Sequence, residues 1–297
     1  MNKNKIKNLL FGVEFEFSEA QLTEIKNLVD IRINMFKHNR HWNVISDCTC
    51  TVNDFAKDIY LGGEVVSPIL NFDNLEDFKE IKTVLELLKE KQAYVNNSTG
   101  LHIHFNAPQV IDSYNYIDFY ELWIAFETVI YKFGFNQFQK GRKILEEHAK
   151  PLGLYQEDYL DFISYCRNNQ VPIEDLSLHY TLNEIIFKKN YGLNFVNILI
   201  EQPHPKDTIE IRCPDSTLEY EEVKTITSFF KDLFEILIND YDKDYVNHLS
   251  HKILEYKSFE TFFSIYKNED LPLFEELLNF MNLDSKQEEK YIRQYLK

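Results

Sequence analysis

Residues 12–17 read Gly-Val-Glu-Phe-Glu-Phe, a strict alternation of large apolar and acidic side chains after the first glycine. Such alternation predicts a β-strand, because successive side chains of a strand point to opposite faces of the sheet. Glu14 and Glu16 then share one face, roughly 6.7 Å apart. Solvated glutamates on a half-exposed strand would produce the same pattern. Two carboxylates between large apolar residues instead favour a partly enclosed site, where a cation compensates their mutual repulsion.

Three further stretches have strand character and carry residues that can bind a metal. They are residues 61–66 with Glu64, residues 100–105 with His102 and His104, and residues 208–212 with Glu210 and Arg212. The two-residue period of a strand places His102 and His104 on one face, and likewise Glu210 and Arg212. Together with Glu14 and Glu16, the four stretches supply four acids, two imidazoles and a guanidinium.

The composition describes a folded protein with an acidic surface. The chain has 297 residues, 44% of them hydrophobic, and a formal net charge of −16. This charge argues against nucleic acid or an anionic membrane surface as the main partner, and no apolar run approaches the roughly 20 residues of a membrane span. The basic start of the chain reaches Glu14 without a small-residue cleavage site, so we expect no signal peptide and a cytoplasmic location. We expect the four cysteines to be reduced thiols.

Periodicity and turn residues predict the other elements. Residues 73–92 carry an apolar stripe of helical period, with Asp73 or Asn74 as the cap. Pro151 and Gly153 are expected to interrupt a helical region at 138–167. The remaining expectations are a loop leading into a helix within residues 18–26, strands at 42–47 and 191–200, a helix at 112–133, and three or four helices after Thr217.

The donor atoms in these strands favour a hard divalent cation. Carboxylates with at most two imidazoles suit Mg²⁺ or Mn²⁺ better than a structural zinc. Four acids exceed what one Mg²⁺ takes, so two or three ions would share the site, as in clusters that hold nucleotide phosphates. No phosphate-binding glycine-rich loop accompanies them. A metal-dependent phosphotransferase or phosphohydrolase and a nucleotide-binding protein without turnover both fit this donor set.

The four motifs in this order resemble the putative amidoligase family, a branch of the glutamine-synthetase-like carboxylate–amine ligases. They are Gly12-Val13-Glu14-Phe15-Glu16, Gly63-Glu64-Val65-Val66-Ser67-Pro68, Gly100-Leu101-His102-Ile103-His104 and Glu210-Ile211-Arg212. The strand that begins at Trp42 is similar to a family strand ending in Asp-Gly-Ser, although Cys48 and Thr49 stand in place of the glycine and serine. The resemblance implies an α+β fold in which a curved antiparallel half-barrel carries helices on its outer face.

The resemblance also implies the domains and the roles of individual residues. An amidoligase-like catalytic domain would span residues 1–235, with C-terminal helices of residues 236–297 packed on it. One metal would be bound by Glu16 and Glu64, and another by Glu14, His102 and Glu210. His104 would lie near the nucleotide, Arg142 would match a family arginine at the cofactor, and Asp47 would lie near the incoming amine. Arg212 would face the transferred phosphoryl group, with Glu64 and Glu210 completing the catalytic set.

The reaction implied by the resemblance consumes ATP with Mg²⁺ or Mn²⁺. A substrate carboxylate takes the γ-phosphoryl group to give an acyl phosphate, and an amine then displaces phosphate to form an amide. The partners would be a small-molecule or peptide carboxylate and an amine. The sequence specifies neither of them, nor the oligomeric state.

Overall fold

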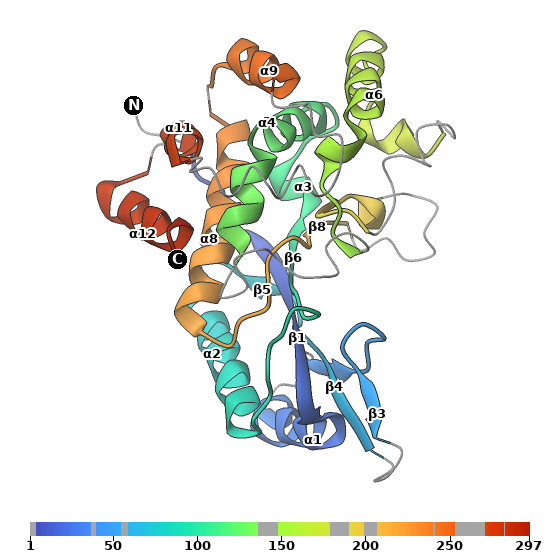
Figure 1. The fold of residues 1–297 in the computed structure, drawn as a ribbon, viewed down its shortest axis with the longest axis vertical. Coiled ribbons are helices and arrows are strands. Elements are labelled where there is room, and N and C mark those ends of the chain that lie inside the picture. The colour runs from blue at the N-terminus through green and yellow to red at the C-terminus, as the bar shows by residue number, and fades with distance from the viewer. Residues whose placement is uncertain are drawn as a thin grey trace.

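A single antiparallel sheet organises the molecule in the computed structural model, which describes residues 4–36, 40–54, 59–135, 148–178, 190–198, 207–239, 241–252, 271–281 and 283–297. Within these residues the sheet has eight strands, in the order β2-β4-β1-β6-β8-β7, with β3 also paired to β4 and β5 to β1. The strands are β1 (Leu10–Gln21), β2 (Asn43–Ile45), β3 (Val52–Asp54), β4 (Ile59–Val66), β5 (Leu70–Asn71), β6 (Leu101–Asn106), β7 (Leu193–Asn194) and β8 (Thr208–Ile211). The expected α+β class with an antiparallel sheet is confirmed (Figure 1).

Helices surround the sheet and continue into a helical C-terminal region, as predicted. They are α1 (Leu22–Arg32), α2 (Leu75–Glu90), α3 (Ala107–Val110), α4 (Tyr116–Gly134), α6 (Gln156–Asn168), α8 (Tyr220–Leu237), α9 (Lys243–Lys252), α11 (Leu271–Met281) and α12 (Ser285–Tyr295). Short 3-10 turns occupy Asn34–Phe36, Leu152–Tyr155, Ile173–Leu178 and Val196–Ile198. None of the described helices has the length and apolar character needed to cross a membrane.

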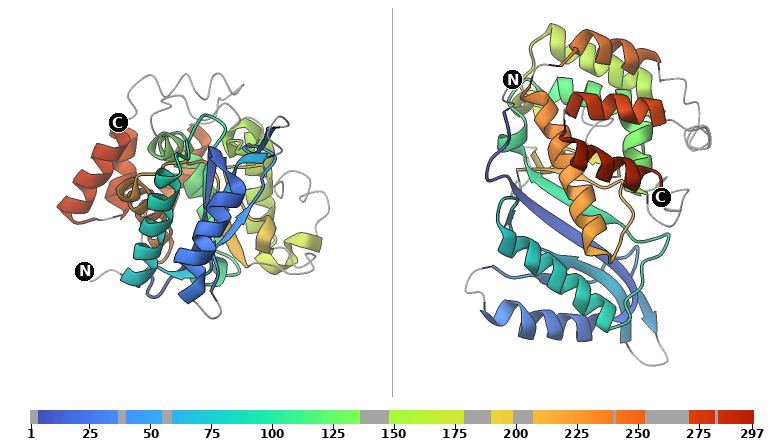
Figure 2. Two further views of the ribbon diagram at one scale, coloured as in Figure 1. Left: turned by 90° about the horizontal axis from the view of Figure 1, so that it is seen from below. Right: turned by 90° about the vertical axis from the view of Figure 1, so that its left-hand side faces the viewer.

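One face of the sheet is apolar and covered by helices. The turned view in Figure 2 shows α1, α2 and α8 lying across this face. Phe11 of β1 contacts Phe78 of α2 with their ring centroids 5.7 Å apart. Phe105 of β6 meets Phe234 of α8 edge to face at 5.1 Å. Because these residues hold odd positions on their strands, the even positions, including all the glutamates and histidines of the motifs, point to the opposite face.

The C-terminal helices pack on α4 and α8 through stacked aromatic rings. Phe133 of α4 lies over Phe229 of α8 with centroids 3.9 Å apart. Phe274 of α11 adds a contact to Phe133 at 5.6 Å, and Tyr291 of α12 meets Phe229 at 5.4 Å. The helix α4 is buried on nearly every side. It therefore connects the C-terminal helices to the loops that approach the polar face of the sheet.

Most of the predicted elements are present, and two predictions are wrong. Within residues 18–26 the expected helix is present as α1, but residues 18–21 continue β1 where a loop was expected. Ser18 pairs with Tyr94, and Gln21 pairs with Leu61 beyond an irregularity at Glu19, whose φ is 66°. The predicted strand at 191–200 is represented only by the two-residue strand β7, which is followed by a 3-10 turn at Val196–Ile198. The chain turns there because the Asn194 side chain accepts the Val196 N–H at 2.8 Å. Residues 199 and 200 lie outside the described residues.

Two other predictions are refined by the structure. The cap of α2 is Asn74, whose side chain accepts the Glu76 N–H at 3.1 Å, while Asp73 accepts the Asn8 N–H. The expected helix at 112–133 begins four residues later, at Tyr116. Of the expected region 138–167, the structure describes residues from 148 onward, where a 3-10 turn follows Pro151 and leads into α6. The four cysteines form no disulfide.

Candidate active site

Strand register brings the acidic and imidazole side chains of four strands onto one face. Glu64 of β4 lies opposite Glu16 of β1, and Glu14 of β1 lies opposite His102 of β6. Glu210 of β8 lies opposite His104 of β6. Directly opposed residues in an antiparallel pair have Cβ atoms about 5 Å apart. Three adjacent cross-strand pairs therefore form one continuous polar cluster over β4, β1, β6 and β8.

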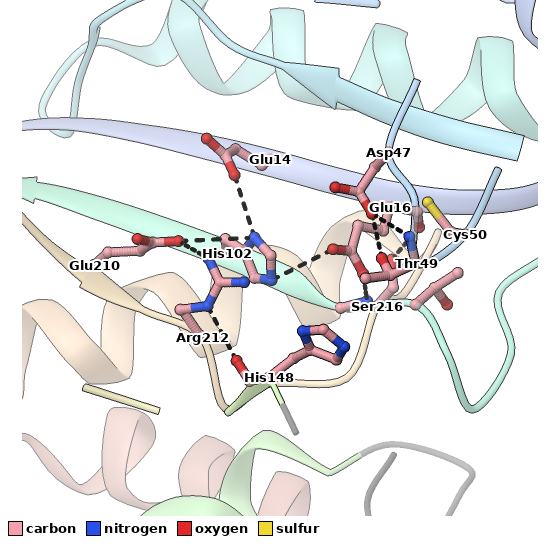
Figure 3. Close-up of polar contacts among 12 residues, drawn as sticks. Glu14, Glu16, Asp47, Thr49, Cys50, His102, His148, Glu210, Arg212 and Ser216 are labelled. Carbon is pink, nitrogen blue, oxygen red and sulfur yellow. Dashed lines mark hydrogen bonds and ion pairs between the residues drawn. The ribbon is translucent and has the colours of Figure 1, made fainter. Parts of the chain in front are cut away.

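His102 lies at the centre of this cluster (Figure 3). Its Nδ1 is 3.2 Å from a Glu14 carboxylate oxygen and 3.8 Å from a Glu210 oxygen. Its Nε2 is 3.6 Å from a Glu16 oxygen. The ring is only 3% exposed, so these interactions operate with little solvent. One imidazole thus contacts carboxylates on both sides through its two nitrogens.

His104 extends the cluster toward β8. Its Nε2 is 3.1 Å from a Glu14 oxygen and 3.9 Å from a Glu210 oxygen. Its Nδ1 is 3.4 Å from the Thr208 hydroxyl. Glu14 therefore lies between the two histidines and is shared by them.

Arg212 is the one guanidinium that contacts the cluster among the described residues. Its Nη1 donates to Glu210, and its Nε donates to the backbone carbonyl of His148 at 3.2 Å. The other Glu210 oxygen accepts from the Asn194 side-chain amide at 2.7 Å. Glu210 is 5% exposed, and its carboxylate is held from two directions.

The cluster contains two groups of three side chains with the geometry of a metal site. Glu14, His102 and Glu210 form one group, and Glu16, Glu64 and His102 form the other. Within each group, one ligand atom from each residue lies within 4.8 Å of the others. His102 belongs to both groups, so the two candidate sites are adjacent. These groups include all five side chains that were predicted as metal ligands.

The carboxylates differ in their electrostatic environments. Burial would raise the pKa of Glu14, but the hydrogen bonds and charges of His102 and His104 outweigh burial and hold that pKa well below its ordinary value. Burial likewise opposes ionisation of Glu210, and the Arg212 charge keeps its pKa low. Glu64 shows the opposite balance, because burial and the charges of Glu14, Asp47 and Glu16 raise its pKa to about 8. Among the described residues, the cluster brings four carboxylates together with two imidazoles and one guanidinium.

A cavity of about 350 Å³ adjoins the cluster on the side of Glu14 and His104. Its polar lining includes Glu14, His104 and Thr208, and its apolar lining includes Val66, Pro68 and Ile69. This volume lies within the roughly 300–1,000 Å³ of small-molecule sites. Glu14 and His104 are therefore shared between the candidate metal groups and an adjoining cavity.

Three residues named from the sequence lie differently from the main cluster. Asp47 accepts from both the backbone and the hydroxyl of Thr49, so its carboxylate caps a turn beside Glu64. Ser67 accepts the Val13 N–H at 2.8 Å and fixes the β1–β4 edge of the cavity. Arg142 lies outside the described residues.

Sequence reasoning missed three contributors to the site. The Gly100 N–H donates to Glu16 at 2.5 Å, Asn194 donates to Glu210, and the His148 carbonyl accepts from Arg212. Two of these are backbone groups, which carry no residue-specific signal. Asn194 did carry one, since it is a polar residue within a stretch that is otherwise largely apolar.

The fold and the cluster define an α+β protein that concentrates buried carboxylates and imidazoles, ligands suited to hard divalent cations, on one face of an antiparallel sheet. Comparison with known families matches residues 7–234 to the family described as "Putative amidoligase enzyme". The chain belongs to this family, whose description is that of a ligase forming amides. A search of curated proteins finds none that matches.

Proposed function

We propose that this protein is an ATP-dependent carboxylate–amine ligase that forms an amide through an acyl phosphate. The observation that carries the proposal is the pair of three-residue donor groups that share His102 beside a cavity of nucleotide-compatible size. Family membership supports amide formation. The dependence on ATP and the order of the steps follow from the resemblance to the glutamine-synthetase-like ligases, and the donor set of the site is compatible with both.

The donor set fits two divalent cations of the Mg²⁺ or Mn²⁺ type. Glu14, His102 and Glu210 would hold one ion, and Glu16 and Glu64 would hold the other with His102 at their border. The chemistry of the donor set supports this fit, because hard divalent cations prefer carboxylate oxygens. Burial and the charges of Glu14, Asp47 and Glu16 raise the pKa of Glu64, and a bound cation would oppose this effect. Bound ions would screen the charges of a phosphate and a carboxylate that must approach each other.

We place the nucleotide in the adjoining cavity, with its phosphates toward Glu14 and His104. The apolar lining from Val66, Pro68 and Ile69 suits a planar base. An imidazole at the junction of cavity and cluster can donate to a phosphate oxygen, as His104 would here. We place Arg212 at the γ-phosphoryl oxygens, because a guanidinium beside the metal groups can bind a phosphoryl group bidentately.

The reaction then proceeds in two steps, phosphoryl transfer and amide formation. A carboxylate oxygen of the substrate attacks the γ-phosphorus of ATP, and the bond to the bridging oxygen breaks, which releases ADP. The amine nitrogen next attacks the acyl carbon and expels inorganic phosphate, and the nitrogen loses a proton. Arg212 stabilises charge on the phosphoryl oxygens in the first step.

Hydroxylamine provides a test that needs no knowledge of the natural amine. The protein is incubated with Mg²⁺-ATP, hydroxylamine and pools of amino acids or short peptides, and hydroxamate and ADP are measured together. We expect hydroxamate to form in proportion to ADP with one pool, and Glu210→Gln to abolish both products.

The alternatives give different results in the same assay. Phosphate release without hydroxamate, in every pool and equally without hydroxylamine, would indicate a phosphohydrolase. Binding of Mg²⁺-ATP with no ADP in any pool would favour a nucleotide-binding protein without turnover. Either result would replace the ligase proposal.

A further inference from the structure

Helix α4 carries two buried polar side chains, Glu127 and Tyr131, that face the loop of residues 148–153. One Glu127 oxygen accepts the Leu152 N–H at 2.7 Å, and the other accepts the Gly153 N–H at 2.7 Å. The Tyr131 hydroxyl, one helical turn further on, donates to the Ala149 carbonyl at 2.8 Å. Both side chains are fully buried. The loop is thus fixed at both of its ends to a helix that lies in the protein core.

The same loop contacts Arg212 at its first residue. The His148 carbonyl accepts the Arg212 Nε–H at 3.2 Å, and Figure 3 shows this contact beside the Arg212–Glu210 pair. Glu210 and the His148 carbonyl together hold two edges of the guanidinium. The position of the 148–153 loop therefore bears directly on where the guanidinium points.

A second connection runs through the backbone of residues 190–192. The backbone N–H of Lys150 donates to the Asn190 carbonyl at 2.7 Å, and the Lys150 carbonyl accepts the Gly192 N–H at 3.0 Å. The Gly192 carbonyl in turn accepts the backbone N–H of Arg212 at 2.7 Å. A Cβ atom at Gly192 would lie 1.9 Å from the Tyr131 hydroxyl oxygen. Only glycine leaves room for that phenol, so Tyr131 packs at the point where the loop and Arg212 meet.

We propose that Glu127 and Tyr131 are positioning residues that set the orientation of Arg212 toward the transferred phosphoryl group, a role that rests on the proposed function. A buried carboxylate is costly in a protein interior unless hydrogen bonds compensate it. Glu127 is fully buried, and among the described residues three N–H groups donate to it, the third being the Trp123 indole at 2.9 Å. Burial raises its pKa to about 7, against the effect of these donors. Glu127 therefore fixes the position of the 148–153 loop, although burial of its carboxylate is unfavourable.

The chain offers matched controls on the same helix. Glu121 is also a buried glutamate of α4, but it binds Arg167 of α6 and Asn247 of α9. Tyr116 is also a buried tyrosine of α4, but its hydroxyl donates to the Val171 carbonyl at 3.0 Å. Glu121→Gln and Tyr116→Phe remove the same groups as Glu127→Gln and Tyr131→Phe without touching the 148–153 loop.

The first measurement follows Arg212 directly and does not depend on any activity. The Nε–H resonance of Arg212 is assigned by its loss in Arg212→Lys, and its exchange with solvent is measured by NMR in the wild-type chain and in the four variants. We expect exchange to rise at least about tenfold in Glu127→Gln and Tyr131→Phe, as for loss of a hydrogen bond worth about 1.4 kcal/mol. The two control variants should match the wild type. Unchanged exchange in both Glu127→Gln and Tyr131→Phe, or an equal rise in all four variants, would overturn the proposal.

The second measurement tests the consequence for the nucleotide. Arg212 contacts the γ-phosphoryl group in the proposed complex, so the ratio of the Kd for Mg²⁺-ADP to that for Mg²⁺-ATP should fall about tenfold in Glu127→Gln and in Arg212→Lys, and stay at the wild-type value in Glu121→Gln. A Glu127→Gln ratio equal to that of the wild type would contradict the positioning role. If the wild-type chain binds neither nucleotide while the NMR result holds, the ligase proposal fails and the control of Arg212 by α4 stands.

Discussion

Helix α4 and the polar face of the sheet both bury glutamates, and they compensate the charge differently. On α4, Glu121 meets the Arg167 guanidinium at 2.7 and 2.8 Å, and Glu127 meets three N–H donors. On the sheet, four glutamates share one guanidinium and two imidazoles among the described residues. Glu16 also accepts the Gly100 N–H, and Glu210 also accepts the Asn194 amide. Each α4 carboxylate therefore has its own donors, whereas the carboxylates of the sheet compete for a few.

This difference separates a structural carboxylate from a candidate ligand better than burial does. Glu127 and Glu210 are both buried, and both are held by hydrogen bonds. Among the described residues, Glu210 belongs to a three-residue donor group with a second carboxylate, and Glu127 does not. Burial and the charges of Glu14, Asp47 and Glu16 raise the pKa of the neighbouring Glu64. Excess negative charge in a buried cluster is stable when a cation enters it. The predictions below test this distinction in order of the size of the effect expected.

Removal of a sheet carboxylate should produce the largest effect on function. We expect Glu210→Gln to weaken Mn²⁺ binding by more than the roughly hundredfold loss found when only a ligand's supporting group is changed, and to abolish ADP formation. Calorimetric titration with Mn²⁺ measures the first quantity. Glu121→Gln, which removes a buried charge from α4, should leave Mn²⁺ affinity as in the wild type. Equal Mn²⁺ affinity in the wild type and Glu210→Gln would remove Glu210 from the metal site.

Removal of the α4 carboxylate should instead affect stability. Glu127→Ala leaves three buried N–H donors without their acceptor, which predicts a loss of about 3 kcal/mol in the free energy of unfolding. Urea denaturation monitored by tryptophan fluorescence measures it, and Trp123 lies next to the substitution. Mn²⁺ affinity of the folded variant should be close to that of the wild type. A variant as stable as the wild type would mean that the 148–153 loop is held by other contacts.

The pH dependence of metal binding should reveal the charge excess on the sheet. Glu64 has a pKa of about 8 without metal, so it carries a proton at neutral pH and must release it to become a ligand. Mn²⁺ affinity should therefore rise as pH increases from 6 to 8, by up to about tenfold per unit, and level off above pH 8. Glu64→Gln should flatten this rise. The same slope in wild type and variant would show that another group supplies the proton.

Alternation in the sequence predicted the polar face of the sheet because each strand encodes it locally. A period of two places Glu14 with Glu16 and His102 with His104 regardless of tertiary structure. The pairing of strands added the cross-strand contacts, such as Glu14 with His102. The order of the motifs carried the resemblance to the family, which supplied the roles of these residues, and therefore most of the candidate site could be named from the sequence.

The support behind Arg212 could not be predicted in this way. Besides its pair with Glu210, Arg212 contacts the backbone carbonyls of His148 and Gly192, which any residue possesses. Glu127 lies on a helix with apolar residues on nearly every side, so its sequence context gives no indication that it faces a loop near the site. The continuation of β1 through Ser18 was missed for a similar reason, since it depends on pairing with the distant Tyr94. Contacts between backbone groups far apart in the sequence leave no local pattern.

The smallest effect is expected for the stability of the metal-free protein, and its sign distinguishes the sheet from α4. The folded-state pKa of Glu64 is raised from 4.5 to about 8, so the folded protein binds more protons than the unfolded chain between these values. This contribution to stability is complete below pH 4.5 and is lost as pH rises through 8.

Glu64→Gln lacks the charge, so it should exceed the wild type in stability by about 1 kcal/mol at pH 9, after allowance for the partial exposure of the side chain. The difference in stability should shrink toward pH 5. Urea titrations at both pH values in the presence of a chelator measure this difference. Removal of a charge on α4 lowers stability, so a loss of stability for Glu64→Gln at pH 9 would mean that the sheet carboxylates are compensated by donors in the same way as Glu127.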